Sequence, residues 1–468
     1  MSPPALDHTR SRLLEGPIGR TLLSLSVPII LGNLLQTGYQ LTDAFWIGRL
    51  GAVAVAAVAV SLPVTFLVIA LGSGLAMAGA VLIAQYAGAG QQHSVDHVAG
   101  QTMVMVLITS ILLAAAGYLL TPNYLTLLDV ANDVRADALG FMRMSFVGVV
   151  FVFVYAMFQA LMRGIGHTRL PLFIVLGTVV LNFMLDPLFI FGWGPVPGAG
   201  VVGAALATVV TQGLAASVGI AVLLRGRHGI HLQWQRLRPD AAYLRHAFLL
   251  GLPGSIDLST RAVGLIVMPF MLARFGTLPI AVYGVGATVL QVASIPAAGL
   301  SMALSTLVGL HLGAGKVARA KKIARLGIGC GFGGLSAVGV GAFLGAPALV
   351  ALLIPSDAQA IVAGTHFIRI MALTWGGIGI QFCTVAVLRA SGRMGQAMVI
   401  GLASQWLIQF PLAYVLSRHT QLQADGVWWS FPVSNLVAAL LALGWFAHSN
   451  WTRGRFTAPA GHAWGTTG

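Results

Sequence analysis

The sequence predicts an all-α integral membrane protein with twelve transmembrane helices in two six-helix bundles, which are related by a parallel internal repeat. Three observations lead to this fold class. Hydrophobic residues make up 57% of the 468 residues and charged residues only 8%, whereas soluble domains carry about 25% charged residues. Twelve apolar stretches are long enough to cross a bilayer. The two halves of the chain resemble each other at a shift of 225 residues.

The twelve spans follow from hydropathy, because an apolar run of about 18 or more residues can cross a membrane as a helix. The predicted spans are 22–47, 53–84, 98–120, 138–160, 170–191, 200–224, 246–272, 280–311, 324–354, 360–388, 396–417 and 427–449. They predict a cytoplasmic segment (1–21), an N-terminal lobe (22–224), a cytoplasmic linker (225–245), a C-terminal lobe (246–449) and a cytoplasmic tail (450–468).

The basic residues predict the orientation of the helices, since cytoplasmic loops are enriched in Lys and Arg. With the N-terminus inside, 19 of the 26 Lys and Arg residues fall on the cytoplasmic side and five on the outer side. We therefore expect both termini in the cytoplasm. The net charge of +14 does not indicate nucleic-acid binding, because the charges occupy short gaps between apolar runs. His93 and His97, beside one such gap, are expected to be solvated.

The internal repeat is clearest between residues 74–90 and 299–315, where eight of seventeen positions are identical. At the same shift, Pro28 falls on Pro253. Six spans before the linker and six after it leave the two halves in the same orientation, which makes the repeat parallel, with its axis along the membrane normal. Two such lobes are typical of transporters in which rocking of the lobes gives alternating access.

Three aspartates lie well inside apolar runs, where each charge costs about 2.5–3.5 kcal/mol and therefore needs a partner or a function. The first, Asp43, belongs to a polar stripe of the first span that also contains Gln36, Tyr39 and Gln40. Such a stripe faces the interior of the bundle or a water-filled cavity. The alternative is a carboxylate that only bonds a neighbouring helix.

The second aspartate, Asp186, lies on the fifth span in one helical row with Thr178 and Asn182. We expect Asp43 and Asp186 at similar depth in the outer half of the N-terminal lobe. Two neighbouring carboxylates in a low dielectric cannot both ionise cheaply, so they predict a site for a proton or for a cation such as Na⁺. Carboxylate, amide and hydroxyl oxygens are hard ligands suited to such an ion. The alternative is again a purely structural helix contact.

The third aspartate, Asp257, differs because Arg261 follows four residues later on the same face of the seventh span. A structural ion pair and a role in substrate binding or gating both stay open. Weaker cavity candidates are isolated polar residues, each of which is more often a helix-packing residue. They are Tyr155, Gln159, Thr208 and Gln291.

The sequence gives no support for enzymatic chemistry. It contains no Walker A, HExxH, CxxC or GxSxG motif, so we expect neither an enzyme nor a cofactor. The two cysteines, Cys330 and Cys383, lie in apolar runs and offer no disulfide framework.

Several stretches resemble one family. The first span reads VPIILGNLLQTGYQLTDAFWIGRLG, the fifth contains LNFMLDPLFIFG, the sixth contains GAALATVVTQ, and both halves carry related glycine-rich loops. From about Pro17 to Trp451 the chain resembles the multidrug and toxic compound extrusion (MATE) family, in particular its prokaryotic DinF-like branch.

This resemblance implies two six-helix lobes around a central cavity and a secondary active antiporter. An amphipathic, often cationic drug or toxic compound would leave the cell while H⁺ or Na⁺ enters. The coupling residues of the family map onto four positions of the N-terminal lobe, which would also be the ligands of a bound Na⁺: Asp43, Asn182, Asp186 and Thr208. A seventh-helix glutamate of another branch falls on Arg261, so coupling is expected through the N-terminal lobe.

The resemblance also implies a multi-pass protein of the bacterial inner membrane whose partners are membrane lipid and small drug-like molecules. We expect a monomer. The alternative function is a flippase of lipid-linked precursors. A flippase for a pyrophosphate-bearing lipid should line its cavity with several Arg or Lys, whereas only Arg261 and Arg369 remain once the other basic residues are assigned to the two sides of the membrane. A channel is less compatible with the lobed repeat and the clustered carboxylates.

Overall fold

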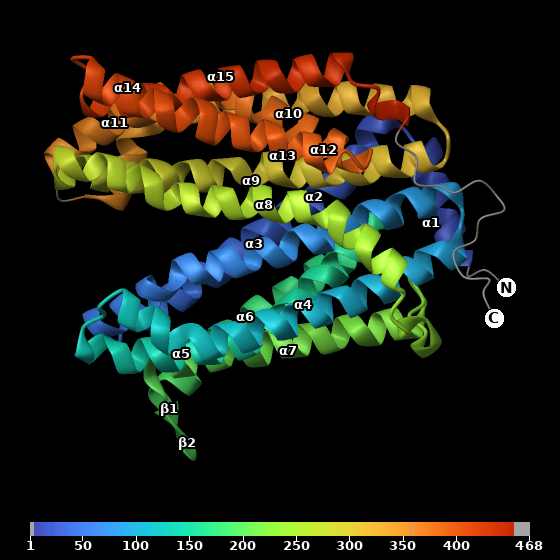
Figure 1. Cartoon of the computed structure of the whole chain (residues 1–468), viewed down its shortest axis with the longest axis horizontal. Coiled ribbons are helices and arrows are strands. Elements are labelled where there is room, and N and C mark those ends of the chain that lie inside the picture. Colours follow the sequence, from blue (N-terminus) through green and yellow to red (C-terminus); the bar gives the residue numbers. More distant parts are fainter. Residues whose placement is uncertain (1–3, 356, 454–468) are drawn as a thin grey trace. The chain divides into compact units, whose positions relative to one another are not determined.

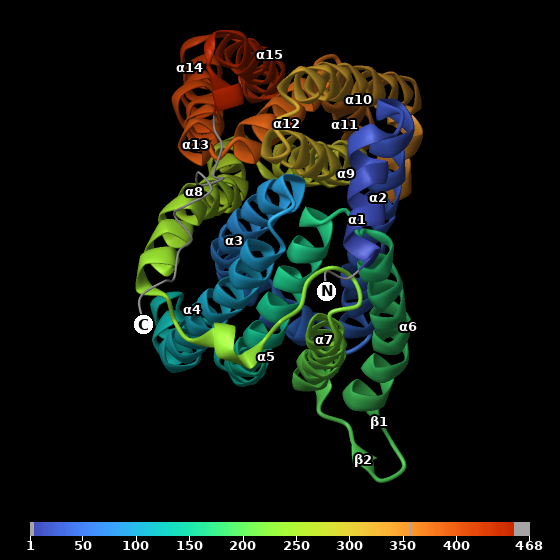
Figure 2. The ribbon, with the colours of Figure 1, turned by 90° about the vertical axis from the view of Figure 1, so that its right-hand side faces the viewer.

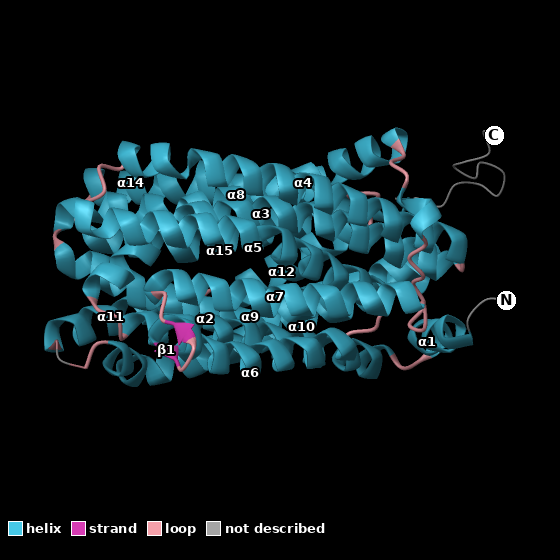
Figure 3. Cartoon of the chain, turned by 90° about the horizontal axis from the view of Figure 1, so that it is seen from below, coloured by secondary structure: helices cyan, strands magenta, loops and turns pink. Residues whose placement is uncertain are grey.

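The computed structural model describes residues 4–355 and 357–453. In this part of the chain nearly every residue belongs to a helix, and Figure 3 shows one small pair of strands besides loops. Eleven helices are long and apolar enough to cross a membrane, and twelve when the bent pair α11 and α12 is counted as one span. The predicted fold class, an all-α multi-pass membrane protein, is confirmed.

The chain forms two compact units, and the first contains residues 1–15 and 31–259. Its elements, labelled in Figure 1, are α1 (Pro4–Glu15), the second part of α2 (Ile18–Gly48), α3 (Ala52–Ala89), α4 (Gln92–Leu127), α5 (Asn132–Gly164), α6 (Arg169–Phe191), β1 (Gly192–Trp193), β2 (Val196–Pro197), α7 (Gly200–Arg225), a 3-10 turn (Trp234–Leu237) and the first part of α8 (Ala241–Leu272). Within this unit α5 packs against α3, α4 and α7, and α6 packs against α7 (Figure 2).

The second unit contains residues 16–30 and 260–468. Its elements are the first part of α2, the second part of α8, a 3-10 turn (Ala273–Phe275), α9 (Thr277–Gly313), α10 (Val317–Leu353), α11 (Ala358–Ala372), α12 (Trp375–Ala390), α13 (Met394–Leu402), a π-helical segment (Ala403–Gln409), α14 (Phe410–His419), α15 (Ala424–His448) and a 3-10 turn (Trp451–Arg453). Here α10 packs against α9, α11 and α12, and α12 packs against α15.

Two predicted spans of the second unit are not regular helices. The span predicted over 360–388 is broken into α11 and α12, which meet at an angle of 48°. The span predicted over 396–417 contains the π-helical segment directly before Pro411. Proline has no amide hydrogen to donate, and its ring clashes with the carbonyl group four residues earlier. A locally widened turn accommodates the proline without ending the span.

The boundary between the units passes through two long helices that are repeat mates. It crosses α2 between Ile30 and Leu31, and α8 between Ser259 and Thr260. In the first unit, a Cβ at Gly74 of α3 would lie 2.2 Å from the amide nitrogen of Ser255. In the second unit, a Cβ at Gly299 of α9 would lie 3.0 Å from the amide nitrogen of Ile30. Both pairs are related by the shift of 225 residues, so each unit repeats the same close helix crossing.

These units are not bounded as the predicted lobes are. The predicted lobes begin at residues 22 and 246, near the starts of α2 and α8, whereas the unit boundary lies farther along these two helices. The predicted cytoplasmic segment 1–21 contains a helix, α1, that the sequence pattern did not indicate. The Arg10 guanidinium donates to the carbonyl oxygen of Gly88, at 2.9 Å from Nη2, and Leu13 is buried against Gly166. Most of the predicted tail 450–468 lies outside the described residues.

Candidate functional site

The first unit holds a group of polar side chains on α2, α6 and α7. Asn182 and Asp186 lie one turn apart on α6, and the Asn182 amide donates to Oδ1 of Asp186 at 3.0 Å. Both side chains are fully buried. Thr178, one turn earlier, donates its hydroxyl to the carbonyl of Val175 and is therefore satisfied within its own helix. The i, i+4 spacing thus fixes one oxygen of Asp186 from within α6.

Asp43 approaches this pair from α2. Its half-buried carboxyl faces the side chains of Asp186, Asn182 and Thr208. The predicted set of four residues is therefore brought together, with one residue from α2, two from α6 and one from α7. Sequence spacing placed each of these residues on one face of its helix. In the structure, the polar faces of the three helices meet in the first unit.

The tyrosine of the same α2 face fixes α2 to α7. The hydroxyl oxygens of Tyr39 and Thr211 lie 2.8 Å apart in a buried position. Thr211 gives its hydrogen to backbone carbonyls of its own helix, at 2.9 Å for Ala207. Tyr39 is therefore the donor and Thr211 the acceptor. Tyr39 was predicted as a cavity residue, and its hydrogen bond holds α2 beside the carboxylates.

Three acceptor oxygens in this group are left without a donor. Oδ1 of Asp43, Oδ2 of Asp186 and Oδ1 of Asn182 are buried, and none accepts a hydrogen bond within the described part of the chain. An unsatisfied buried acceptor costs about 1–3 kcal/mol, and more when it is charged. The arrangement is therefore suited to a proton or to a hard monovalent cation, which would satisfy the oxygens and offset the carboxylate charge.

Aromatic and aliphatic packing closes the group towards the end of α2. The Trp46 ring lies 5.8 Å from the Phe183 ring and 6.2 Å from the Phe191 ring. Ile47 belongs to a buried cluster with Ile190, Val201 and Ala204. Low dielectric on this side strengthens every electrostatic interaction of the carboxylates.

One residue of this layer was missed by the sequence reasoning. The indole nitrogen of Trp46 is buried and donates to no acceptor among the described residues. It lies three positions after Asp43, on the same helix face. The spacing from Asp43 was the one signal available for it in the sequence.

The remaining predicted residues lie apart from this group. Gln36 and Gln40 are exposed on α2, and Gln291 is exposed on α9 of the other unit. Tyr155 is buried on α5 and donates to the carbonyl of Pro171 at 3.3 Å, next to the half-buried Gln159.

Asp257 and Arg261 follow each other by one turn on α8, where the unit boundary passes between them. Asp257 is 2% exposed and Arg261 is half-buried, and each has an interaction partner. Neither belongs to the group around Asp43.

Comparison with known proteins places the chain in a family. The sequence pattern of the MatE family matches residues 28–188 and 256–415, more than half of the chain. The chain belongs to the MatE family. The resemblance noted in the sequence is thereby confirmed, while the DinF-like branch stays a prediction. The two matched stretches begin at nearly repeat-related positions, as expected when each lobe of a MatE protein is one copy of the repeat.

Two relatives of this MatE chain illustrate the range of the family. The "Probable multidrug resistance protein YoeA" of Bacillus subtilis is 28% identical over 437 residues, which cover 92% of this chain and 93% of the relative. The "FAD transporter" of Shewanella oneidensis is 27% identical, covering 92% and 95%. A solved "multidrug resistance MATE family transporter" in an outward-facing conformation has 22% identity and a TM-score of 0.88, covers 96% of this chain and 98% of its own, and shares the fold.

Proposed function

We propose that the protein is a secondary active antiporter that exports amphipathic, often cationic drugs or toxic compounds in exchange for H⁺ or Na⁺. The observation that carries this proposal is the group of three donor-free oxygens around Asp43 and Asp186, buried among apolar side chains of the first unit. Membership of the MatE family and the multidrug-resistance names of its relatives support the transport of drugs.

Coupling would work through competition between the ion and the substrate. The incoming ion would neutralise the Asp43/Asp186 pair, with Asn182 and Thr208 as further ligands if the ion is Na⁺. A cationic substrate would need the same negative charge and would be released when the ion binds. The ion shifts the transport cycle only by its different affinity for the two access states.

α2 is the element through which we expect this change to act. Asp43 and Tyr39 lie on the part of α2 that belongs to the first unit, and residues 16–30 of the same helix belong to the second. A change of charge at Asp43 therefore acts on a helix that is shared by both units. Gln36 and Gln40 on α2, Tyr155 and Gln159 on α5, Asp257 and Arg261 on α8 and Gln291 on α9 are our candidates for the substrate route.

The alternative is transport of an anionic compound, such as a lipid-linked precursor. The relative named as an FAD transporter shows that anionic cargo occurs among MatE relatives. Phosphate-bearing substrates call for several Arg or Lys side chains at the site, and the group around Asp43 is acidic. We therefore favour a cationic substrate, together with a monomer in the inner membrane whose termini are cytoplasmic.

The test is dye efflux from everted vesicles, driven first by an imposed H⁺ gradient and then by an imposed Na⁺ gradient. One gradient should drive export of a cationic dye by the wild type, and Asp43→Asn should abolish that export. Asp137→Asn is the matched control, because it makes the same change at a half-buried position of α5 that does not belong to the group around Asp43. Full gradient-driven efflux by Asp43→Asn would contradict the coupling role, and transport of anionic cargo alone would favour the alternative.

A further inference from the structure

The segment between α7 and α8, predicted as a simple linker, is bound to one face of α4. At its start, Oδ1 of Asp96 accepts from the backbone amide of His231 at 2.9 Å, and the Gln92 amide donates to the carbonyl of Gly229 at 2.9 Å. The Gln92 amide also donates to Asp96 at 2.9 Å. Two side chains of α4 thus hold the backbone of residues 229–231.

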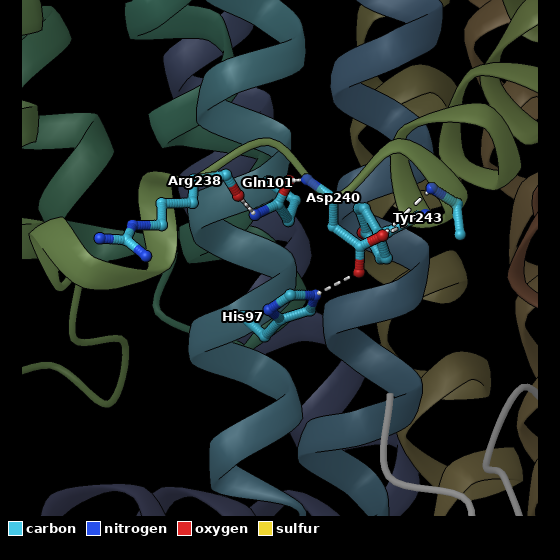
Figure 4. A network of polar contacts seen from close by, with 6 residues as sticks. His97, Gln101, Arg238, Asp240 and Tyr243 are labelled. Atoms are coloured by element: carbon cyan, nitrogen blue, oxygen red, sulfur yellow. Dashed lines mark hydrogen bonds and ion pairs between the residues drawn. The ribbon is translucent and has the colours of Figure 1, made fainter. Parts of the chain in front are cut away.

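A second attachment holds the end of the linker and is drawn in Figure 4. The Gln101 amide donates to the carbonyl of Arg238 at 2.7 Å, and its carbonyl oxygen accepts from the amide of Asp240 at 2.9 Å. One side chain therefore satisfies both a backbone acceptor and a backbone donor. Gln101 is 1% exposed, because the linker covers it.

Asp240 connects this attachment to α8. Its Oδ1 accepts from the amides of Ala242 and Tyr243, each at 3.1 Å, so it caps the first turn of α8. Its Oδ2 lies 3.5 Å from Nε2 of His97 on α4. Figure 4 shows the His97 ring pointing towards Asp240, while the Arg238 side chain extends away from it. The beginning of α8 is therefore fixed to α4 by one carboxylate.

Two tyrosines and a second carboxylate also lie close to the contact between His97 and Asp240. The Tyr243 ring of α8 lies 5.5 Å from it edge-on, and Tyr86 of α3 lies near Tyr243. Asp96, the preceding residue on α4, is taken up by Gln92 and the backbone of His231. The contact between His97 and Asp240 corrects the expectation of a solvated histidine.

The internal repeat shows that the fold does not require these residues. At a shift of 225, the four positions of α4 correspond to Val317, Lys321, Lys322 and Leu326 of α10. Lys321, Lys322 and Leu326 are exposed. The same helix face that is open in the second unit is covered by the linker in the first. The attachment is therefore an addition to the first unit.

We propose that the linker is a docked strap whose hold on α4 is set by the protonation of His97, so that acidification of the side on which the linker lies tightens the strap and slows transport. Protonated His97 would form a full ion pair with Asp240, and neutral His97 only a weak polar contact. The strap matters for transport because α8 begins directly after Asp240 and runs from the first unit into the second. The effect on transport rests on the proposed antiport function, and docking itself does not.

Hydrogen exchange tests the strap without any transport. In the wild type, the amide of Asp240 should be protected from hydrogen exchange. At the same pH, Gln101→Leu should reduce this protection about fivefold, which is the effect of losing one hydrogen bond. After correction for intrinsic exchange, protection should be higher at about pH 5.5 than at about pH 7.5, on either side of the ordinary histidine value. His97→Gln should remove this difference, and His93→Gln, an exposed histidine one turn earlier, should keep it.

Substrate exchange with the same pH on both sides of the membrane tests the regulation. The ratio of wild-type to His97→Gln rates should fall about two- to fivefold between about pH 7.5 and about pH 5.5, the range of an exposed ion pair. The ratio cancels any titration that both proteins share. An unprotected Asp240 amide in the wild type would overturn docking, and a constant ratio with a protected amide would overturn regulation. Absence of any substrate exchange would count against the proposed antiport. Hydrogen exchange of the Asp240 amide would then still decide whether the linker is docked.

Discussion

At the scale of single residues, the central feature is that few hydrogen-bond donors in the described part of the chain reach the carboxylates of Asp43 and Asp186. Among the described residues, Asn182 is the one side chain that donates to Asp186, and it presents its own unsatisfied oxygen to the same group. Thr208 faces Asp43 from α7, and Tyr39 and Thr211 hold α2 and α7 together beside it. The site is therefore rich in acceptors and poor in donors, as a site that receives a cation should be.

Asn182→Leu should destabilise the protein and also disturb ion coupling. The substitution removes the donor to Asp186 and leaves a buried acceptor unsatisfied, which costs about 1–3 kcal/mol. Thermal unfolding in detergent measures the loss. Thr178→Val is the control, because its hydroxyl bonds only within α6 and its loss should cost less. Equal stability of Asn182→Leu and wild type would show that the bond to Asp186 contributes nothing.

The sequence predicted the position of the acidic group well, and its partners less well. Carboxylates in the middle of a membrane span are rare, so Asp43 and Asp186 were conspicuous in the sequence. Helical spacing was then enough to place Asp43, Asn182 and Asp186 on polar helix faces. The hydrogen bond between Tyr39 and Thr211 depends on the packing of α2 against α7, which spacing within one helix does not encode. The polar face of α4 that holds the linker was not recognised, since Gln92 and Gln101 are ordinary at the end of a span.

At the scale of elements, hydropathy identified the spans and missed their interruptions. The break between α11 and α12 and the π-helical segment before Pro411 do not lower the mean hydropathy of either span. α1 also escaped prediction, because it is short and mostly polar, and its contacts at Gly88 and Gly166 are tertiary. Apolar runs report on the membrane, whereas breaks and surface helices follow from local hydrogen bonding.

Gly379→Ala should separate α10 from α12. A Cβ at this position would lie 2.1 Å from the carbonyl oxygen of Gly331, and backbone atoms cannot turn aside as a flexible side chain can. Overpacking of this kind costs about 1–3 kcal/mol, measurable as a lower unfolding temperature in detergent. The same change at Gly333 on α10 meets no atom within 4 Å and should be harmless. Unchanged stability of Gly379→Ala would refute the tight crossing.

Protonation of the loop between α5 and α6 should destabilise the first unit. Burial lowers the pKa of His167, and the neighbouring His228 and Arg12 lower it further. The folded state therefore takes up a proton less readily than the unfolded chain. Stability is lost as the pH falls through the ordinary histidine value of 6.5 towards the lowered value, and none is lost above it.

The measurement is the unfolding temperature in detergent at about pH 5 and about pH 7.5. His167→Asn should lose less stability on acidification than the wild type does. His419→Asn, at an exposed helix end, should behave like the wild type. The same acid-induced loss in His167→Asn and wild type would show that this loop does not carry the effect.

At the scale of the whole molecule, the two units are built on one plan with unequal chemistry. Each unit contains the second half of a long helix whose first half belongs to the other unit. Each unit also has one close helix crossing at a glycine, at Gly74 in the first unit and at Gly299 in the second. The acidic group around Asp43 and the linker attachment on α4 belong to the first unit alone. In the repeat register Asp43 corresponds to Met268, so ion coupling is expected to be a property of one unit.

The most direct test is to count the ions that substrate binding displaces. Purified protein in weakly buffered detergent is titrated with a cationic dye, while released H⁺ and released Na⁺ are recorded in separate experiments. We predict that wild type and Asp137→Asn release one of these ions on binding the dye, and that Asp43→Asn binds the dye with little or no release. Equal ion release by Asp43→Asn and wild type would contradict coupling through the carboxylates of the first unit.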